Sequence, residues 1–284
     1  MFELKRIGIV KRASALLLDI ILLAVLATGM IFVISLICNY DAEEKKANDY
    51  YEQWEDFRSK YIADVADYYG FEYEVSEDGN NYTIKKDGEA SSLNKVLIAL
   101  VNDENRDSSP LMSEAYGAYK ALPPLNAVNA QYEFVYNLLF MMVSIGILLA
   151  YLILELIIPL IFKNGQTIGK KVFSIGVIQQ NGIKISNLSL FARTVIGKYA
   201  IETMFPTLLI FLFLFGELGL LAIILLAALA LLNIILFFTT KNKTPIHDII
   251  VSTVVIDISL QEIYQSEDEM VEKKAKDYIK SPKS

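Results

Sequence analysis

The sequence has few of the residues that most enzyme sites use. Its 284 residues include one cysteine, one histidine and one tryptophan. A single cysteine excludes an intrachain disulfide and a CxxC site, and a single histidine excludes a multi-histidine zinc site. The sequence also has no Walker loop, GxGxxG or GxSxG pattern, so nucleotide and serine-hydrolase chemistry have no support. We therefore expect a protein that is not an enzyme and that needs no cofactor or metal.

Apolar residues, in contrast, are abundant and concentrated. They make up 54% of the chain and dominate residues 13–38, 134–162 and 199–238. Each region exceeds the roughly 18 residues that a helix needs to cross a bilayer core of about 30 Å. The last region is about twice that length and is interrupted by GELG at 216–219, which indicates a helical hairpin. The first is longer than the 7–15 apolar residues of a signal peptide. The sequence thus predicts four transmembrane helices.

The distribution of charge predicts the orientation of these helices. Residues 39–132 contain 19 acidic against 9 basic residues, whereas 163–198 contain no acid at all. Further basic residues lie before the first and after the last apolar region: Lys5, Arg6, Lys11, Arg12, Lys241 and Lys243. Because Lys and Arg are in excess on the cytoplasmic side of membrane proteins, we expect both termini inside and 39–132 outside.

The segments between the apolar regions have their own periodicity. In the acidic segment, a three- and four-residue repeat over 47–68 and another over 93–101 predict helices. Between them, 71–75 and 81–85 alternate around a turn at Asp78-Gly79, which predicts a hairpin. On the basic side, KVFSIGVIQ, the turn QNG and IKIS predict a second hairpin, and 250–259 is a further β-rich run that could join its sheet. Residues 187–200 predict an interfacial helix leading into the third span, and 260–284 a solvated tail, helical or frayed.

One polar residue lies within each predicted transmembrane helix. Each is seven to nine residues from a basic residue at the cytoplasmic side, or about 10–14 Å along a helix: Asp19, Glu155, Glu202 and Asn233. A carboxylate at the centre of a membrane helix costs about 2.5–3.5 kcal/mol, so these groups should face one another, a cation or water. They either bind a transported cation or join the helices structurally. Glu202 also has a local alternative, an i,i+4 pair with Lys198.

Three motifs together resemble the RDD family of bacterial membrane proteins. They are Arg12-Ala13 followed by Asp19, GQTIGKKVFSIGV at 165–177, and TPIHDIIVSTVVI at 244–256. Arg193 lies where that family commonly has an arginine before its third span. The arginine and two aspartates that name the family fall here on Arg12, Asp19 and Asp248. The long segment between the first two spans departs from the family pattern.

The resemblance implies a multi-pass protein of the bacterial cell membrane, for which transport of ions or small solutes has been suggested. It adds Asp248, which we expect to pair with Arg12 or to anchor the start of the following β-rich run. His247 is expected at a surface or interface. The GQTIGKK segment either contacts lipid headgroups, through Lys170, Lys171 and Arg193, or forms a turn anchored by its lysines.

We therefore predict an all-α integral membrane protein with a four-helix transmembrane bundle, a small α+β extracytoplasmic insertion and a short cytoplasmic sheet. Its predicted parts are the N-terminus with the first helix (1–38), the insertion (39–132), the other three helices with the cytoplasmic hairpin (133–258) and a charged tail (259–284). The leading functional hypothesis is transport of a cation or a proton-coupled small solute through the polar layer.

Three partners are considered: the lipid bilayer, a second copy of the chain and a protein bound by 39–132; no nucleic acid is expected. The alternative function is a scaffold, assembly factor or envelope sensor that acts through 39–132. An enzyme acting on lipid is a weaker third alternative.

Overall fold

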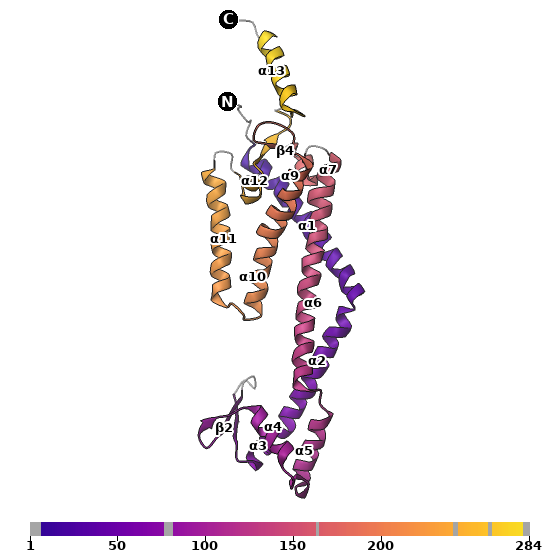
Figure 1. Ribbon diagram of the computed structural model, residues 1–284, viewed down its shortest axis with the longest axis vertical. Coiled ribbons are helices and arrows are strands. Elements are labelled where there is room, and N and C mark those ends of the chain that lie inside the picture. The colour runs from indigo at the N-terminus through magenta and orange to yellow at the C-terminus, as the bar shows by residue number, and fades with distance from the viewer. Residues whose placement is uncertain (1–6, 77–81, 163–164, 241–243, 261–262, 281–284) are drawn as a thin grey trace. The chain divides into compact units, whose positions relative to one another are not determined.

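The computed structural model is mostly helical and describes residues 7–76, 82–162, 165–240, 244–260 and 263–280 (Figure 1). It divides into two compact units, one of residues 1–37 with 140–284 and one of residues 38–139. We call the first the helical unit and the second the acidic unit. Several residues used in the sequence predictions lie outside the described residues: Lys5, Arg6, Asp78, Gly79, Lys163, Lys241 and Lys243.

Within the described residues, three long helical stretches have the length and composition needed to cross a membrane: Ile9–Cys38, Pro110–Phe162 and Asn187–Leu214. The first is α1, and the second ends in α6 (Leu125–Tyr151), η3 (Leu152–Ile157) and α7 (Ile158–Phe162). The third is made of α9 (Asn187–Phe191), η4 (Ala192–Met204) and α10 (Phe205–Leu214). The structure therefore supports three of the four predicted spans by length and composition, and a lipid environment for them.

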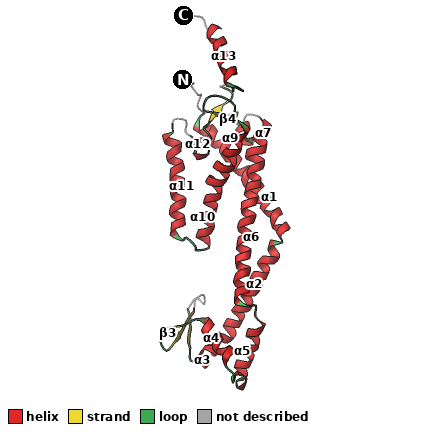
Figure 2. Cartoon of the chain, viewed as in Figure 1, coloured by secondary structure: helices red, strands yellow, loops and turns green. Residues whose placement is uncertain are grey.

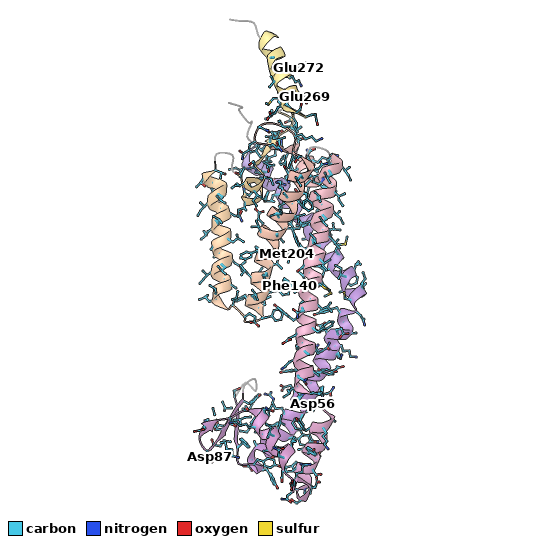
Figure 3. The ribbon with its side chains drawn as sticks, viewed as in Figure 1. Asp56, Asp87, Phe140, Met204, Glu269 and Glu272 are labelled. Atoms are coloured by element: carbon cyan, nitrogen blue, oxygen red, sulfur yellow. The ribbon has the colours of Figure 1, made fainter. Side chains whose placement is uncertain are left out.

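The fourth predicted span corresponds to α11 (Leu220–Thr239). This helix is apolar over Leu220–Leu236 and is shorter than the other three stretches. The predicted turn at GELG separates α10 from α11, and the two helices run side by side (Figure 2). Gly216 and Gly219 both have positive φ, 76° and 48°, a backbone conformation that most other residues avoid. Figure 3 labels Phe140 on α6, whose ring centroid lies 5.3 Å from that of Phe211 on α10.

A two-stranded sheet joins segments that are far apart in sequence. Strand β4 (Ile175–Gln179) pairs antiparallel with β5 (Thr253–Asp257), with Ile175 opposite Asp257. This pairing confirms that the two predicted β-rich runs share a sheet. A short helix precedes each strand: α8 (Ile168–Val172) and α12 (Ile246–Ile250). Lys11 of α1 contacts Asp257 at 2.5 Å, so the sheet is also tied to the first helix.

The acidic unit is an α+β fold with its own apolar core. Helices α2 (Tyr40–Phe57), η1 (Arg58–Ile62) and α3 (Ala63–Tyr68) form the first predicted helical segment. Strands β1 (Glu72–Val75), β2 (Tyr82–Lys86) and β3 (Glu89–Ala90) form an antiparallel sheet in that order, and Asp87, labelled in Figure 3, begins the turn between β2 and β3. The unit continues with α4 (Leu93–Asn102), η2 (Arg106–Ser108) and α5 (Pro110–Ala121). The third strand and α5 were not predicted.

Aromatic and aliphatic side chains at helical spacing fill this core. Trp54, Phe57 and Leu97 are among its buried members, and the Trp54 indole donates a hydrogen bond of 2.9 Å to the Pro123 carbonyl. The core thus accounts for the aromatic periodicity seen between residues 47 and 68. In the helical unit, α13 (Glu267–Lys280) is the helix formed by the charged tail.

Two neighbouring residues of α4 test this core. Leu97 is 2% exposed and Ile98 is 48% exposed. Leu97→Ala should destabilise the acidic unit by about 2–5 kcal/mol, because it removes buried methyl groups and leaves a cavity. Ile98→Ala is the matched control and should change little. Urea unfolding followed by the fluorescence of Trp54, the single tryptophan, reports both variants, and an equal effect of the two would contradict the assigned core.

Candidate functional site: a charged cavity in the helical unit

Four charged side chains of the helical unit lie in two π-helical segments that end close to prolines. Glu155 lies in η3 and Glu202 in η4, and each is four residues before a proline, Pro159 and Pro206. A proline has no N–H to offer to the carbonyl four residues earlier. At Glu155 this carbonyl instead accepts a hydrogen bond of 2.9 Å from the Thr194 hydroxyl. The i→i+5 pattern of π-helix is frequent at functional sites.

These segments, with α1, α8 and α12, surround a cavity of about 350 Å³ that we call the charged cavity. Its polar lining contains four carboxylates and four basic groups: Asp19, Glu155, Glu202, Asp248, Arg12, Lys170, Arg193 and Lys198. His247 and Tyr151 also line the cavity. The remainder of the lining is mainly apolar, with Leu16, Ile20 and Leu23 from α1. The eight charges balance when His247 is neutral, which is the arrangement that buried charges require.

Asp19 is held mainly by neutral donors. Its carboxylate accepts a hydrogen bond of 2.5 Å from the Thr167 hydroxyl and one of 2.8 Å from the Gly169 backbone N–H. The Lys170 Nζ lies 3.9 Å away. Gly169 permits this approach, because a Cβ built there would fall 2.8 Å from the Asp19 Oδ1. The carboxylate within the first apolar helix is thus hydrogen-bonded by residues at the start of α8, which belong to the GQTIGKK motif.

Glu155 and Asp248 have charged partners at short range. Lys198 donates a short hydrogen bond to Glu155, and Arg193 Nε donates a hydrogen bond of 2.7 Å to Asp248 Oδ1. The Thr253 hydroxyl also donates a hydrogen bond of 2.8 Å to Asp248 Oδ1. The side chains of Arg193 and Asp248 are only 2% and 1% exposed. Asp248 therefore pairs with Arg193, and Arg12, its expected partner, lines the same cavity.

The remaining acid, Glu202, pairs with the single histidine. Its two oxygens lie 2.7 Å from His247 Nδ1 and 3.1 Å from the His247 backbone N–H. Close packing of α12 against η4 makes this possible at Gly197, where a Cβ would come within 2.6 Å of the His247 Cβ. Glu202 is thus bound across helices, in place of the local pair with Lys198 that its spacing suggested. His247 is an interface residue that lines the cavity.

The other predicted site residues are dispersed. Asn233 of α11 does not line the charged cavity, and its buried Oδ1 has no hydrogen-bond partner among the described residues. Lys171 is exposed, with its Nζ 3.6 Å from the ring centroid of Phe162. Lys170 and Arg193, predicted with Lys171 to contact headgroups, instead line the cavity. Their charges are directed to carboxylates within the protein, since Asp19 and Asp248 lie beside them.

Burial acts on the pKa of Lys170 on α8 and of His247 and Asp248 on α12. Burial, and then the nearby charge of Lys198, lowers the pKa of Lys170 to about 8. Burial also lowers the pKa of His247, against the opposing effect of Asp248. For Asp248 burial opposes ionisation, but Arg193 and His247 outweigh it and hold the pKa below its ordinary range. At neutral pH His247 is therefore neutral and Asp248 is charged.

Sequence reasoning missed the partners that neutralise the carboxylates. Lys198, Thr167 and Thr194 were not assigned to the polar layer, although all three contact its members. One signal could have found part of the site, the repeated spacing of a glutamate four residues before a proline. Among the described residues no cluster of three or more His, Cys, Asp and Glu side chains could hold a metal ion.

Residues 115–252 match the model of the RDD family, which confirms the family resemblance of the sequence motifs. The matched region contains most of the charged cavity, including Asp248, whereas Arg12 and Asp19 precede it. No curated protein and no solved structure matches the chain.

The pair between Arg193 and Asp248 should dominate the stability of this site. Arg193→Gln is expected to cost about 3–5 kcal/mol, because it leaves a buried carboxylate without its charged partner. Lys60→Gln is the control, since Lys60 pairs with Glu114 at 3.0 Å on the surface, with side chains 64% and 58% exposed. Denaturant midpoints in detergent should fall clearly for Arg193→Gln and remain in place for Lys60→Gln. Equal midpoints for wild type and Arg193→Gln would contradict the assigned pair.

Proposed function

We propose that this RDD family protein moves a small solute across the membrane through the charged cavity, by binding its cationic group at Asp19 in exchange for a proton. One observation carries the proposal: a cavity lined by four carboxylates, four basic groups and a histidine lies among helices that are apolar enough to span a bilayer. Ionisable groups at membrane depth are costly and typically line transport or proton pathways. Helix association alone would need fewer of them, since small and singly polar residues suffice for it.

Asp19 is the carboxylate best suited to exchange. Glu155, Glu202 and Asp248 each have an ionisable partner within 2.7 Å, so a solute would have to break a close pair to reach them. Asp19 is held by two neutral donors and has its cation at 3.9 Å. A solute ammonium or guanidinium can therefore approach Asp19 without breaking a close ion pair. Glu155, another carboxylate of the predicted polar layer, then has a structural role.

The proposed arrangement in the membrane has four spans. With 20 residues, α11 is about 30 Å long and can cross the bilayer core beside α10. An even number of spans places both termini on one side, and the basic residues of 163–198 assign that side to the cytoplasm. The acidic unit then lies outside a bacterial cell membrane. Four helices give a thin wall around a transport path, so we propose a homo-oligomer.

Asp19→Asn tests the transport proposal. The amide keeps the size of the side chain but removes the charge that attracts a cationic group, so flux should be lost. Asp41→Asn is the matched control, because Asp41 is exposed on α2. Wild type and both variants are purified, reconstituted into liposomes and tested under sodium, potassium, organic cation and pH gradients. Unchanged flux in Asp19→Asn, at equal folded yield, would remove Asp19 from the mechanism.

A second candidate function is a scaffold, assembly factor or envelope sensor that acts through the acidic unit. The observation that favours it is the separate core of this unit, in which Trp54, Phe57 and Leu97 are buried together. A unit with its own core can present a binding surface independently of the membrane helices.

This candidate predicts that residues 38–139 fold when expressed alone. Cooperative unfolding by Trp54 fluorescence and crosslinking of one specific protein partner in cells are the expected results. A chain that fails to fold, or that crosslinks to no particular protein, would count against the candidate. Neither result changes the expectation for flux through the charged cavity.

A further inference from the structure

Three basic groups of the charged cavity lie at very different distances from their nearest carboxylates. Lys198 makes a short hydrogen bond to Glu155, and Arg193 contacts Asp248 at 2.7 Å. Lys170 lies 3.9 Å from Asp19, beyond hydrogen-bond distance, and 3.3 Å from the Thr167 hydroxyl. Lys170 is nevertheless well buried, with 12% of its side chain exposed. It is therefore a buried cation whose contact with a carboxylate can be given up at little cost.

Asp19 keeps two hydrogen bonds if the charge of Lys170 is removed. The Thr167 hydroxyl and the Gly169 backbone N–H lie at the start of α8, as does Lys170, but the bonds that they donate to Asp19 do not need the charge of Lys170. These two donors satisfy the carboxylate oxygens of Asp19 whether or not Lys170 carries a charge. Asp19 can then accept another cation in place of Lys170, with the total charge of the cavity unchanged.

The size and lining of the cavity indicate an organic cation. About 350 Å³ is within the range of small-molecule pockets, which are mainly apolar with a few placed polar groups. Leu16, Ile20 and Leu23 supply a continuous apolar stripe on α1, next to Asp19 in the same lining. A solute with one ammonium or guanidinium group and a short aliphatic body would match both features.

We propose that Lys170 occupies the place of the cationic group of an organic solute, and that it releases its proton when the solute binds at Asp19. The ammonium of Lys170 becomes a neutral amine, its proton passes to water, and the solute brings in one positive charge. One charge enters for each proton that leaves, so the exchange is electroneutral. This inference rests on the proposed transport function and identifies its solute class and its proton carrier.

The groups around Lys170 favour such a release. It faces Asp19 from α1, Glu155 from η3, and Arg193 and Lys198 from η4. The farther wall adds Arg12 from α1, Glu202 from η4, and His247 and Asp248 from α12. With its pKa lowered to about 8, Lys170 is charged at neutral pH and loses its proton readily. Release therefore accompanies binding below about pH 8 and ceases above it.

Butylguanidinium is a suitable probe, because a guanidinium has a pKa above about 12 and does not itself titrate in the range studied. Binding to the full-length protein in detergent is measured by calorimetry in buffers of different ionisation enthalpy, which counts the protons released. Wild type should release about one proton per bound cation, and its affinity should rise roughly tenfold per pH unit up to about pH 8.

Lys170→Gln should bind the probe with no linked proton release and with an affinity that does not vary with pH. Lys170→Arg should bind more weakly than wild type, because arginine cannot give up its proton. Lys171→Gln, which changes the exposed neighbour, should behave as wild type. Binding by wild type without proton release, or release that persists in Lys170→Gln, would overturn the inference, and the first of these results does not depend on any variant folding.

Failure of the inference can be distinguished from failure of the proposed function. Wild type that neither binds butylguanidinium nor transports any cation would refute both. Wild type that transports sodium or potassium but does not bind butylguanidinium would refute the organic solute and leave transport in place. Flux coupled to protons in both wild type and Lys170→Gln would refute only the role of Lys170.

Discussion

The structure of the helical unit depends on one constraint, that a charge removed from water must find a partner. Burying an ion without a partner costs several kcal/mol, which is a large part of the stability of a typical domain. Every carboxylate of the charged cavity is accordingly met by a basic or neutral donor from another element. The close approaches at Gly169 and Gly197, where a side chain would not fit, allow α1 and α12 to reach these partners. Local backbone geometry in this unit thus follows from the pairing of its charges.

The two π-helical segments also help to bring the buried charges together. An α-helix would present Arg193, Lys198 and Glu202 at different angles around its axis, whereas wider turns with i→i+5 bonds bring residues four and five apart closer to one face. In η4 the spacing of these residues is five and then four. The carbonyl of Glu155, to which Pro159 has no N–H to donate, accepts a hydrogen bond from Thr194 of the neighbouring segment. Interruptions of regular helix and contacts between helices therefore occur at the same place.

Much of the fold could be predicted because it follows from local periodicity. The apolar runs, the hairpin at 72–86, the helix at Leu93–Asn102 and the pairing of β4 with β5 all have patterns of period 3.6 or 2 in the sequence. For the site, the carboxylates were identifiable because charges within apolar runs are conspicuous. Their partners were not, because Thr167, Lys198 and Arg193 meet them only through tertiary packing.

The order in which the chain is synthesised gives the β5 region a further importance. Arg193 enters the growing chain 55 residues before Asp248, and proteins form from the N-terminus as they are made. Until residues 246–257 have emerged, the guanidinium of Arg193 has no carboxylate from α12, and β4 has no partner strand. A chain that ends before this point lacks both the closest carboxylate of Arg193 and the partner strand of β4. The β5 region therefore completes the charge pairing and the sheet in the same stretch of chain.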